Sequence, residues 1–176
     1  MNSLRPILNS YWVIPSSFMA GEYPGAGQEP QAREKLRWLI AQGIDTWIDL
    51  TVANEDGLAP YANWAIEEGE KAGKSIQYQR FSINDMEIPS HEEMTLILDA
   101  IDTNINTGRR IYIHCYGGVG RTGTVVGCYL VRHGIDGEQA IRQIATWRAG
   151  TPKGWRISPE TEDQRQLIMS WREQDV

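Results

Sequence analysis

The sequence predicts an α/β fold, a single domain in which helices flank a central, mostly parallel sheet. Short apolar runs alternate with longer segments of helical periodicity along the chain. No repeat, linker or low-complexity segment interrupts that alternation. The length of 176 residues suits one domain with a substantial core. We therefore expect residues 1–176 to form one domain.

The predicted elements follow one another in the order that crossover connections produce. Strands are predicted at 11–14, 17–20, 44–50, 76–83 and 110–114. Helices are predicted at 29–42, 59–72, 90–105, 121–133, 137–148 and 159–173. Ser90 and Glu93 form a capping box that opens one helix, and Ser158-Pro159 predicts the start of the last one. Strands separated by helices favour parallel pairing with right-handed crossovers.

The most informative segment is 111–123, with the sequence IYIHCYGGVGRTG. It places Cys115 at the end of a strand-like run and Arg121 at the start of a helix. A strand, a glycine-rich turn and a helix N-terminus form an anion cradle, because backbone N–H groups converge there and the helix dipole adds partial positive charge. A guanidinium binds two phosphate oxygens at once. The segment therefore predicts a phosphoryl site that carries its own nucleophile.

The residue types of this loop suit cysteine-based phosphoryl transfer. Thiols beside cations and a helix N-terminus ionise more readily than free thiols, and Cys115 has the loop amides and Arg121 as such neighbours. A thiolate attacks phosphorus to give a phosphocysteine, which water then hydrolyses. Thr122 offers a hydroxyl suited to assisting departure of the thiolate, and His114 is a candidate to orient the cysteine or the loop. The predicted phosphate-binding positions are Cys115, Tyr116, Gly117, Gly118, Val119, Gly120 and Arg121.

This chemistry also needs an acid to protonate the leaving oxygen, and Asp or Glu is a usual donor. Asp85 follows the predicted strand 76–83, so it lies at the same carboxyl edge of a parallel sheet as Cys115. Asp85 is therefore the predicted general acid, and a solvated loop carboxylate is the alternative. The competing carboxylates are Glu87, Glu55 and Asp56.

The string His-Cys-x-x-Gly-x-Gly-Arg-Thr-Gly at 114–123 resembles the signature of the cysteine-dependent protein phosphatases, in particular the compact dual-specificity group. Asp-x-x-x-Pro at 85–89 is similar to the general-acid loop of that family. The resemblance implies a dual-specificity phosphatase fold over most of the chain. Many members present a polar residue near the start of a C-terminal helix to position the hydrolytic water. Gln164 is that candidate here, and an exposed glutamine without a role is the alternative.

The resemblance implies a phosphomonoester hydrolase, in the first place a protein phosphatase for phosphotyrosine. The chain is too short for the pocket-deepening loop of tyrosine-only phosphatases, which extends the expectation to phosphoserine and phosphothreonine. An inositol phosphate or phosphoinositide phosphatase is the alternative, although the loop lacks the lysines that inositide 3-phosphatases often carry. The expected partner is thus a phosphorylated protein or a small phosphomonoester.

Two other classes use a similar loop. A non-catalytic, phosphate-binding pseudophosphatase is expected to have lost Cys115, Arg121 or Asp85, and all three are present. Sulfur transfer and arsenate reduction also use a cysteine in an anion loop. The Gly-Arg-Thr-Gly end of the loop fits cleavage of a phosphate ester better.

Charge and composition limit the classes of partner that we expect. The formal net charge is −6 without a long basic run, so a nucleic acid is not expected. The basic residues Arg109-Arg110 and Arg148, Lys153 and Arg156 either attract an anionic substrate or are ordinary solvated positions. The three histidines show no metal-ligand spacing, so no metal or other cofactor is expected.

The remaining signals concern the compartment. A nucleophilic thiolate must stay reduced, and Cys128 is expected to pack in the core rather than to form a disulfide. The sequence shows no signal-peptide pattern and no run of membrane-spanning length, which predicts a cytoplasmic protein without a membrane partner. Most of the seven tryptophans are expected in the core, with Trp155 as a candidate for the rim of the substrate site.

Overall fold

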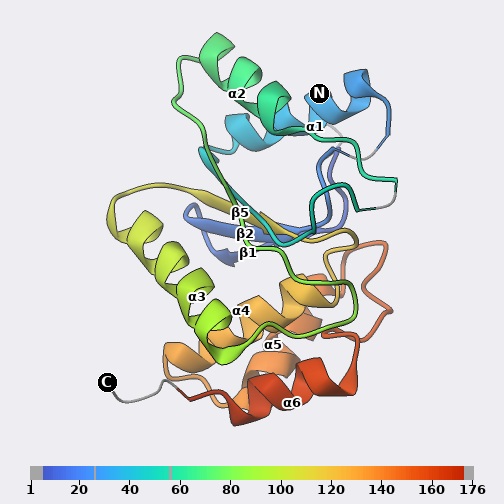
Figure 1. Ribbon diagram of the computed structural model, residues 1–176, viewed down its shortest axis with the longest axis vertical. Coiled ribbons are helices and arrows are strands. Elements are labelled where there is room, and N and C mark those ends of the chain that lie inside the picture. The colour runs from blue at the N-terminus through green and yellow to red at the C-terminus, as the bar shows by residue number, and fades with distance from the viewer. Residues whose placement is uncertain (1–5, 26, 56, 173–176) are drawn as a thin grey trace.

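The computed structural model describes residues 6–25, 27–55 and 57–172. These residues form a five-stranded sheet in the order β1-β2-β5-β3-β4, with helices on both faces (Figure 1). The strands are β1 (Ser10–Ile14), β2 (Phe18–Gly21), β3 (Thr46–Asp49), β4 (Gln77–Arg80) and β5 (Ile111–His114). The helices are α1 (Glu29–Ala41), α2 (Ala62–Lys71), α3 (His91–Asn106), α4 (Arg121–Arg132), α5 (Gly137–Arg148) and α6 (Glu162–Ser170).

The sheet is parallel except for its first pair of strands. β1 and β2 form an antiparallel pair, whereas β2–β5, β5–β3 and β3–β4 are parallel. The prediction of a mostly parallel sheet is confirmed. The register places His114 of the central strand beside Gly21 on one side and Asp49 on the other. The loops after β2, β3, β4 and β5 therefore leave the sheet at one edge, where ligands bind in such sheets.

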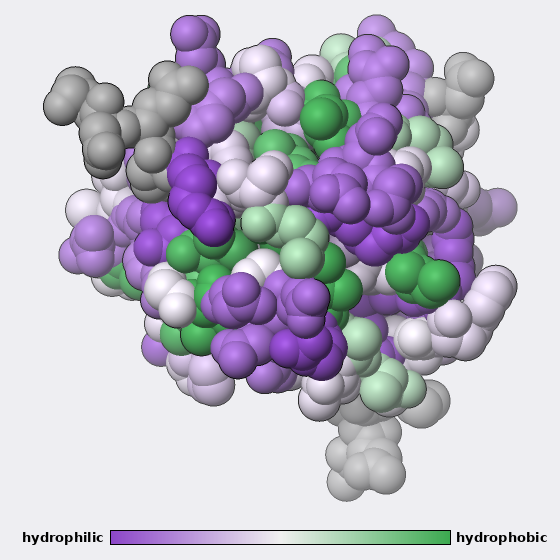
Figure 2. Space-filling view, turned by 90° about the horizontal axis from the view of Figure 1, so that it is seen from below, coloured by the Kyte–Doolittle hydropathy of each residue, from purple (hydrophilic) through white to green (hydrophobic). Residues whose placement is uncertain are grey.

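Two layers of helices cover the sheet. α1 and α2 lie on one face and α3 to α6 on the other (Figure 1). A separate hydrophobic core fills the space under each layer, and all four residues of β5 are buried between them. Seen from the α3–α6 side, mostly hydrophilic side chains cover the surface, with hydrophobic ones showing between them (Figure 2). None of the helices in the described ranges has the length and apolar character needed to cross a membrane.

Most predicted elements appear within a few residues of their expected bounds. The capping box of α3 is present: the Glu93 N–H donates to Ser90 Oγ at 3.2 Å, and the Ser90 N–H donates to Glu93 Oε2 at 2.8 Å. Helix α2 begins at Ala62 rather than at residue 59.

The predicted start of the last helix is wrong. Helix α6 begins at Glu162, and its N-cap is Thr161, whose Oγ1 accepts from the Gln164 N–H at 3.2 Å. Ser158 is not a cap, because its Oγ donates to the carbonyl of Val119 at 2.7 Å in the loop after β5. The helix start therefore moves to the next threonine along the chain.

Candidate active site

The loop 115–120 joins the central strand β5 to α4 and is packed closely against its neighbours. Cys115 is only 3% exposed. Gly118 has a φ of +70°, and a Cβ added there would lie 2.5 Å from the backbone of Gly21, so only glycine fits. The Tyr23 N–H donates to the carbonyl of Tyr116 at 2.9 Å. Together with the Ser158 contact, these interactions fix the loop from two sides.

Arg121 opens α4 and is 1% exposed. Its Nη1 and Nη2 donate to the two carboxylate oxygens of Glu55 at 2.7 and 2.8 Å, and Nη1 also donates to the carbonyl of Ile83 at 2.9 Å. Burial disfavours the charged guanidinium, but the hydrogen bonds to Glu55 together with the electrostatic attraction of Cys115, Glu55 and Asp85 outweigh that effect and raise the pKa of Arg121. The buried Nε has no hydrogen-bond partner among the described atoms. A permanent cation with an unused donor therefore lies beside the loop.

Glu55, one of the competing candidates for the general acid, is not suited to that role. It lies in the loop after β3, and its side chain is only 16% exposed. The hydrogen bonds from Arg121 lower the pKa of Glu55, so this carboxylate stays ionised and is a poor proton donor. The sequence places Glu55 at the correct edge of the sheet, but its pairing with Arg121 is visible only in the fold. Asp56, the neighbouring candidate, lies outside the described residues.

Asp85 lies in the loop after β4 and faces the same cavity as the cysteine. Its Oδ1 is 3.1 Å from Nη2 of Arg121, and its side chain is 63% exposed. Glu87 does not line the cavity, since its carboxylate accepts from Nδ2 of Asn84 at 2.8 Å. The cavity has a volume of about 330 Å³ and is lined by Asp85, Met86, Cys115, Tyr116, Gly117, Val119, Gly120, Arg156 and Glu160.

His114 lies directly behind this cavity and is fully buried. Burial lowers the pKa of His114, which keeps the ring neutral near pH 7. Its Nδ1 is 3.1 Å from the carbonyl of Cys115, which can only accept, so Nδ1 carries the proton. Nε2 then accepts from the hydroxyl of Tyr61 at 2.5 Å. The ring of His114 thus contacts the nucleophilic residue through the backbone carbonyl of Cys115.

Residues 8–170 match the family described as Swiss Army Knife protein, DSP-PTPase phosphatase domain. The chain belongs to this family of cysteine-dependent, dual-specificity-type phosphatases. The putative tyrosine phosphatase 197R of Invertebrate iridescent virus 6 is 30% identical over 145 residues, which cover 79% of this chain and 47% of that protein. The chain spans about half the length of the first curated relatives that it matches.

Two further similarities span nearly the whole phosphatase domain. The Arabidopsis thaliana protein named phosphatidylinositol 3,4,5-trisphosphate 3-phosphatase and protein-tyrosine-phosphatase PTEN1 is 28% identical over 161 residues, or 90% of this chain and 36% of its own length. The crystal structure of Tk-PTP in its active form superposes with a TM-score of 0.68 at 25% identity, covering 91% of this chain and 93% of that one. These similarities confirm both the predicted fold class and the resemblance to dual-specificity phosphatases.

Within this phosphatase domain, Thr122 and Gln164 differ in what their side chains contact. Thr122 is fully buried, and its Oγ1 has no hydrogen-bond partner among the described atoms. Gln164 is also buried, not exposed, and its Oε1 accepts from the N–H groups of Glu160 and Thr161 at 3.1 Å each. Its Nε2 donates to the carbonyl of Glu87 at 3.1 Å. Gln164 therefore joins the start of α6 to the acid loop and is not part of the cavity lining.

Glu160, unlike Gln164, does line the cavity. It pairs with Arg156, which lines the cavity as well. The sequence did not identify Glu160 as a site residue, although it lies four residues before Gln164. The sequence offers one signal for Glu160, a carboxylate in the string Ser-Pro-Glu-Thr shortly before a helix. Carboxylates are common at exposed helix starts, so this signal does not single out a functional residue.

The basic residues noted in the sequence have different positions and contacts in the fold. Arg148 is buried and donates to the carbonyls of Lys153 and Arg156 at 2.9 and 2.8 Å, so it stabilises the segment between α5 and α6. The Lys153 ammonium pairs with Glu22 at 3.2 Å near the loop. Arg109-Arg110 precede β5 at the opposite edge of the sheet and lie away from the site. Cys128, as predicted, is buried in the core.

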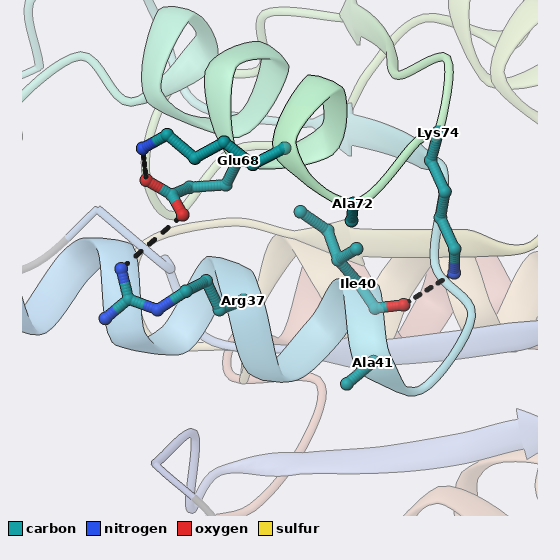
Figure 3. Close-up of a pocket in the computed structure, with 7 residues that line it drawn as sticks. Arg37, Ile40, Ala41, Glu68, Ala72 and Lys74 are labelled. Carbon is teal, nitrogen blue, oxygen red and sulfur yellow. Dashed lines mark hydrogen bonds and ion pairs between the residues drawn. The ribbon is translucent and has the colours of Figure 1, made fainter.

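A second cavity, of about 560 Å³, lies between α1 and α2, away from the loop (Figure 3). Arg37 and Lys71 at its rim both pair with Glu68, and Lys74 Nζ donates to the carbonyl of Ile40 at 2.7 Å. Its lining offers no thiol, imidazole or hydroxyl, so the smaller cavity is the candidate active site. Within the described residues, no three or more His, Cys, Asp or Glu side chains group together to hold a metal ion.

Proposed function

We propose that residues 1–176 form one catalytic domain that hydrolyses phosphomonoesters through a phosphocysteine on Cys115. The observation that carries the proposal is the arrangement around the smaller cavity. Cys115 and Asp85 line it together, and the buried guanidinium of Arg121 lies beside them with an unused donor. Nucleophile, acid and charge clamp thus come from the segments that follow β4 and β5, at one edge of the sheet.

The first step transfers the phosphoryl group to sulfur. The Cys115 thiolate attacks phosphorus, and the S–P bond forms as the P–O bond to the leaving group breaks. Backbone N–H groups of residues 116–120 and the guanidinium of Arg121 stabilise the negative charge on the equatorial oxygens. Asp85 donates its proton to the leaving oxygen, which departs as an alcohol or phenol.

The second step returns the enzyme to its starting state. Water attacks phosphorus and gives a proton to the Asp85 carboxylate, the S–P bond breaks, and inorganic phosphate leaves. The hydroxyl of Thr122, which is buried without another partner, donates to the departing sulfur. Glu160 lines the cavity, and we assign it the contact with this water. Gln164 acts as a positioning residue, because it binds the backbone of Glu160 and of the acid loop.

The substrate proposal follows from the shape of the opening. Met86 and Tyr116 flank the cavity and are half-exposed, which suits contact with the ring of phosphotyrosine. The relatives named as tyrosine phosphatases support this substrate. The dual-specificity type of the family extends the proposal to phosphoserine and phosphothreonine. A reduced thiolate further favours a reducing compartment such as the cytoplasm.

A phosphoinositide headgroup is a second candidate substrate. Lys153 and Arg156 bring two cations to the edge of the cavity, beyond the single charged side chain that the loop itself contributes. Both are paired with carboxylates, so a second phosphate has to displace Glu22 or Glu160.

The decisive experiment compares Cys115→Ser with Cys128→Ser in turnover of an aryl phosphate. We expect no measurable turnover by Cys115→Ser, with folding and binding of tungstate retained in thermal-shift measurements. Cys128→Ser keeps most of the activity, because the core thiol takes no part. Rapid acid quench of the wild type with a fast substrate yields a phosphorylated peptide that contains Cys115. Turnover by Cys115→Ser at the wild-type rate contradicts the covalent mechanism, and a wild type that binds phosphopeptides without hydrolysing any ester is a pseudophosphatase.

A further inference from the structure

Large hydrophobic side chains protrude around the opening of the candidate active site. Met86 and Ile88, in the acid loop, are 50% and 42% exposed, and Tyr116 of the phosphate loop is 56% exposed. Trp155 and Ile157, in the segment between α5 and α6, are 83% and 70% exposed. We call these five residues the collar.

The collar residues come from three loops that lie together. Met86, Tyr116 and Arg156 all line the same cavity, and Trp155 and Ile157 are the chain neighbours of Arg156. In Figure 1 the segment after α5 runs on the same side of the molecule as the loop before α4. Exposed apolar side chains of this size, on loops that meet at one cavity, indicate an interaction surface.

The segment that carries Trp155 and Ile157 is held firmly from inside. The buried Arg148 guanidinium donates to the backbone carbonyls on either side of Trp155, those of Lys153 and Arg156. One residue past Ile157, the hydroxyl of Ser158 donates to the phosphate loop. The two apolar tips are therefore displayed by an anchored backbone, although nothing among the described residues covers them.

Cationic groups lie at the base of these tips. Lys153 and Arg156 flank Trp155, and Lys153 Nζ is 3.9 Å from the position of a Cβ on Gly117 in the phosphate loop. Arg121 is 1% exposed, whereas Trp155 and Ile157 are the most exposed large hydrophobic side chains among the described residues, so the phosphate-binding cation lies deeper than the apolar tips. A phospholipid surface has the complementary order, with phosphate groups just above an apolar layer.

We propose that the collar docks the opening on a lipid surface and that the cavity receives a lipid headgroup ending in a phosphomonoester. The proposal rests on the proposed function, and it adds that the phosphomonoester substrate is part of a lipid in a membrane surface. Tryptophan beside basic residues is typical of membrane interfaces. A fluid lipid layer closes around each of these tips even though they stand on separate loops. Peripheral docking needs no spanning helix, so the sequence expectation of no membrane partner is revised here.

The charge balance predicts how this docking responds to salt. Lys153 and Arg156 are paired with Glu22 and Glu160, and the whole chain carries a formal charge of −6. General attraction to an anionic surface is therefore weak, and insertion of the collar supplies most of the affinity. We expect vesicle binding to persist at high ionic strength, where exposed charge pairs are screened.

The experiment uses the full chain with vesicles of phosphatidylcholine that contain a minor fraction of phosphatidic acid, whose headgroup is a phosphomonoester. Binding is measured by co-sedimentation, and hydrolysis by phosphate release. A short-chain phosphatidic acid, kept below its micelle-forming concentration, presents the same headgroup without a surface. We expect wild-type turnover per headgroup to be at least about tenfold higher on vesicles than on the soluble analogue.

The variants are Trp155→Ala, Ile157→Ala and the double substitution, with Ile66→Ala as a matched control. Ile66 is an exposed isoleucine on α2, far from the opening. We expect the double variant to bind vesicles at least about tenfold more weakly and to lose the preference for vesicles over the soluble analogue. The Ile66→Ala protein should retain both. Folding of each variant is checked by thermal unfolding.

The outcomes separate this proposal from the proposed function. A wild type that hydrolyses neither soluble aryl phosphates nor lipids contradicts the proposed function itself. A wild type that hydrolyses soluble aryl phosphates but neither binds vesicles nor prefers them overturns the lipid proposal alone. Loss of phosphotyrosine-peptide turnover in the collar variants, without loss of vesicle binding, makes the collar a peptide-docking surface and also overturns it.

Discussion

The phosphate loop and the acid loop face the same cavity, but they are held in different ways. The phosphate loop lies between buried elements, and at Gly118 the backbone approach excludes any side chain. The acid loop is open, since Asp85 is 63% exposed and the non-glycine Met86 has a φ of +66°. Stabilising transition-state charge needs dipoles that do not reorganise, so that part belongs inside the fold. The proton donor must reach leaving groups of different sizes, which suits an exposed position.

The largest expected effect comes from the buried side of this comparison. Arg121→Lys keeps the charge but loses the planar fork, and we expect kcat/KM for an aryl phosphate to fall by about 10²–10³-fold. Glu55→Gln keeps the arginine and removes only its anchor, so its loss should be clearly smaller. Steady-state kinetics on both proteins make the test. If lysine substitutes with little loss, Arg121 does not bind the phosphoryl group.

On the exposed side, the expected effect depends on the substrate. Asp85→Asn should slow phenyl phosphate by about 10²-fold, because a poor leaving group needs the proton. An activated nitrophenyl ester should be slowed much less, since its phenolate leaves unaided. A plot of log kcat/KM against leaving-group acidity should therefore be steeper for the variant. Equal slowing across the series would transfer the acid role to another residue, with Glu87 as the first candidate.

A smaller effect distinguishes the two polar residues of the C-terminal segment. Glu160→Gln should slow hydrolysis of the phosphocysteine by roughly tenfold, so that rapid-quench experiments show a larger burst and slower steady turnover. Arg156→Gln breaks the same ion pair from the other side and serves as the control. Gln164→Ala should weaken both steps together, because it releases the acid loop and the start of α6 at once. A burst unchanged in Glu160→Gln removes this residue from the second step.

The contrast between the two loops also explains what the sequence could predict. The phosphate loop is specified by local chemistry, since a strand end, glycines and a helix start are all visible in one short string. Glu160 pairs with Arg156 only four residues earlier, but the cavity that both line is formed by three separate loops. The roles of Glu55 and Ser158 depend on contacts across the fold, with Arg121 and Val119, respectively. Such contacts leave no periodic or spacing signal. The same is true of Gln164, which the sequence presents as a helical glutamine and the fold buries.

The smallest expected effect is on stability, and it tests the buried layer behind the nucleophile. Burial lowers the pKa of His114 from its ordinary value of 6.5, so the folded protein resists protonation there. The unfolded chain takes up a proton near pH 6.5, and the free energy of unfolding should therefore fall as the pH drops from 7 toward 5. One such group contributes at most about 1.4 kcal/mol per pH unit.

Urea unfolding at several pH values measures that slope in the wild type and in His114→Asn. The variant loses the hydrogen bonds to Tyr61 and to the Cys115 carbonyl, so it should be less stable at pH 7, but its stability should change less between pH 7 and 5. His133→Asn, at an exposed position on the surface, is the control for histidine loss. A slope that survives in His114→Asn shows that the imidazole behind Cys115 is not held neutral by the fold.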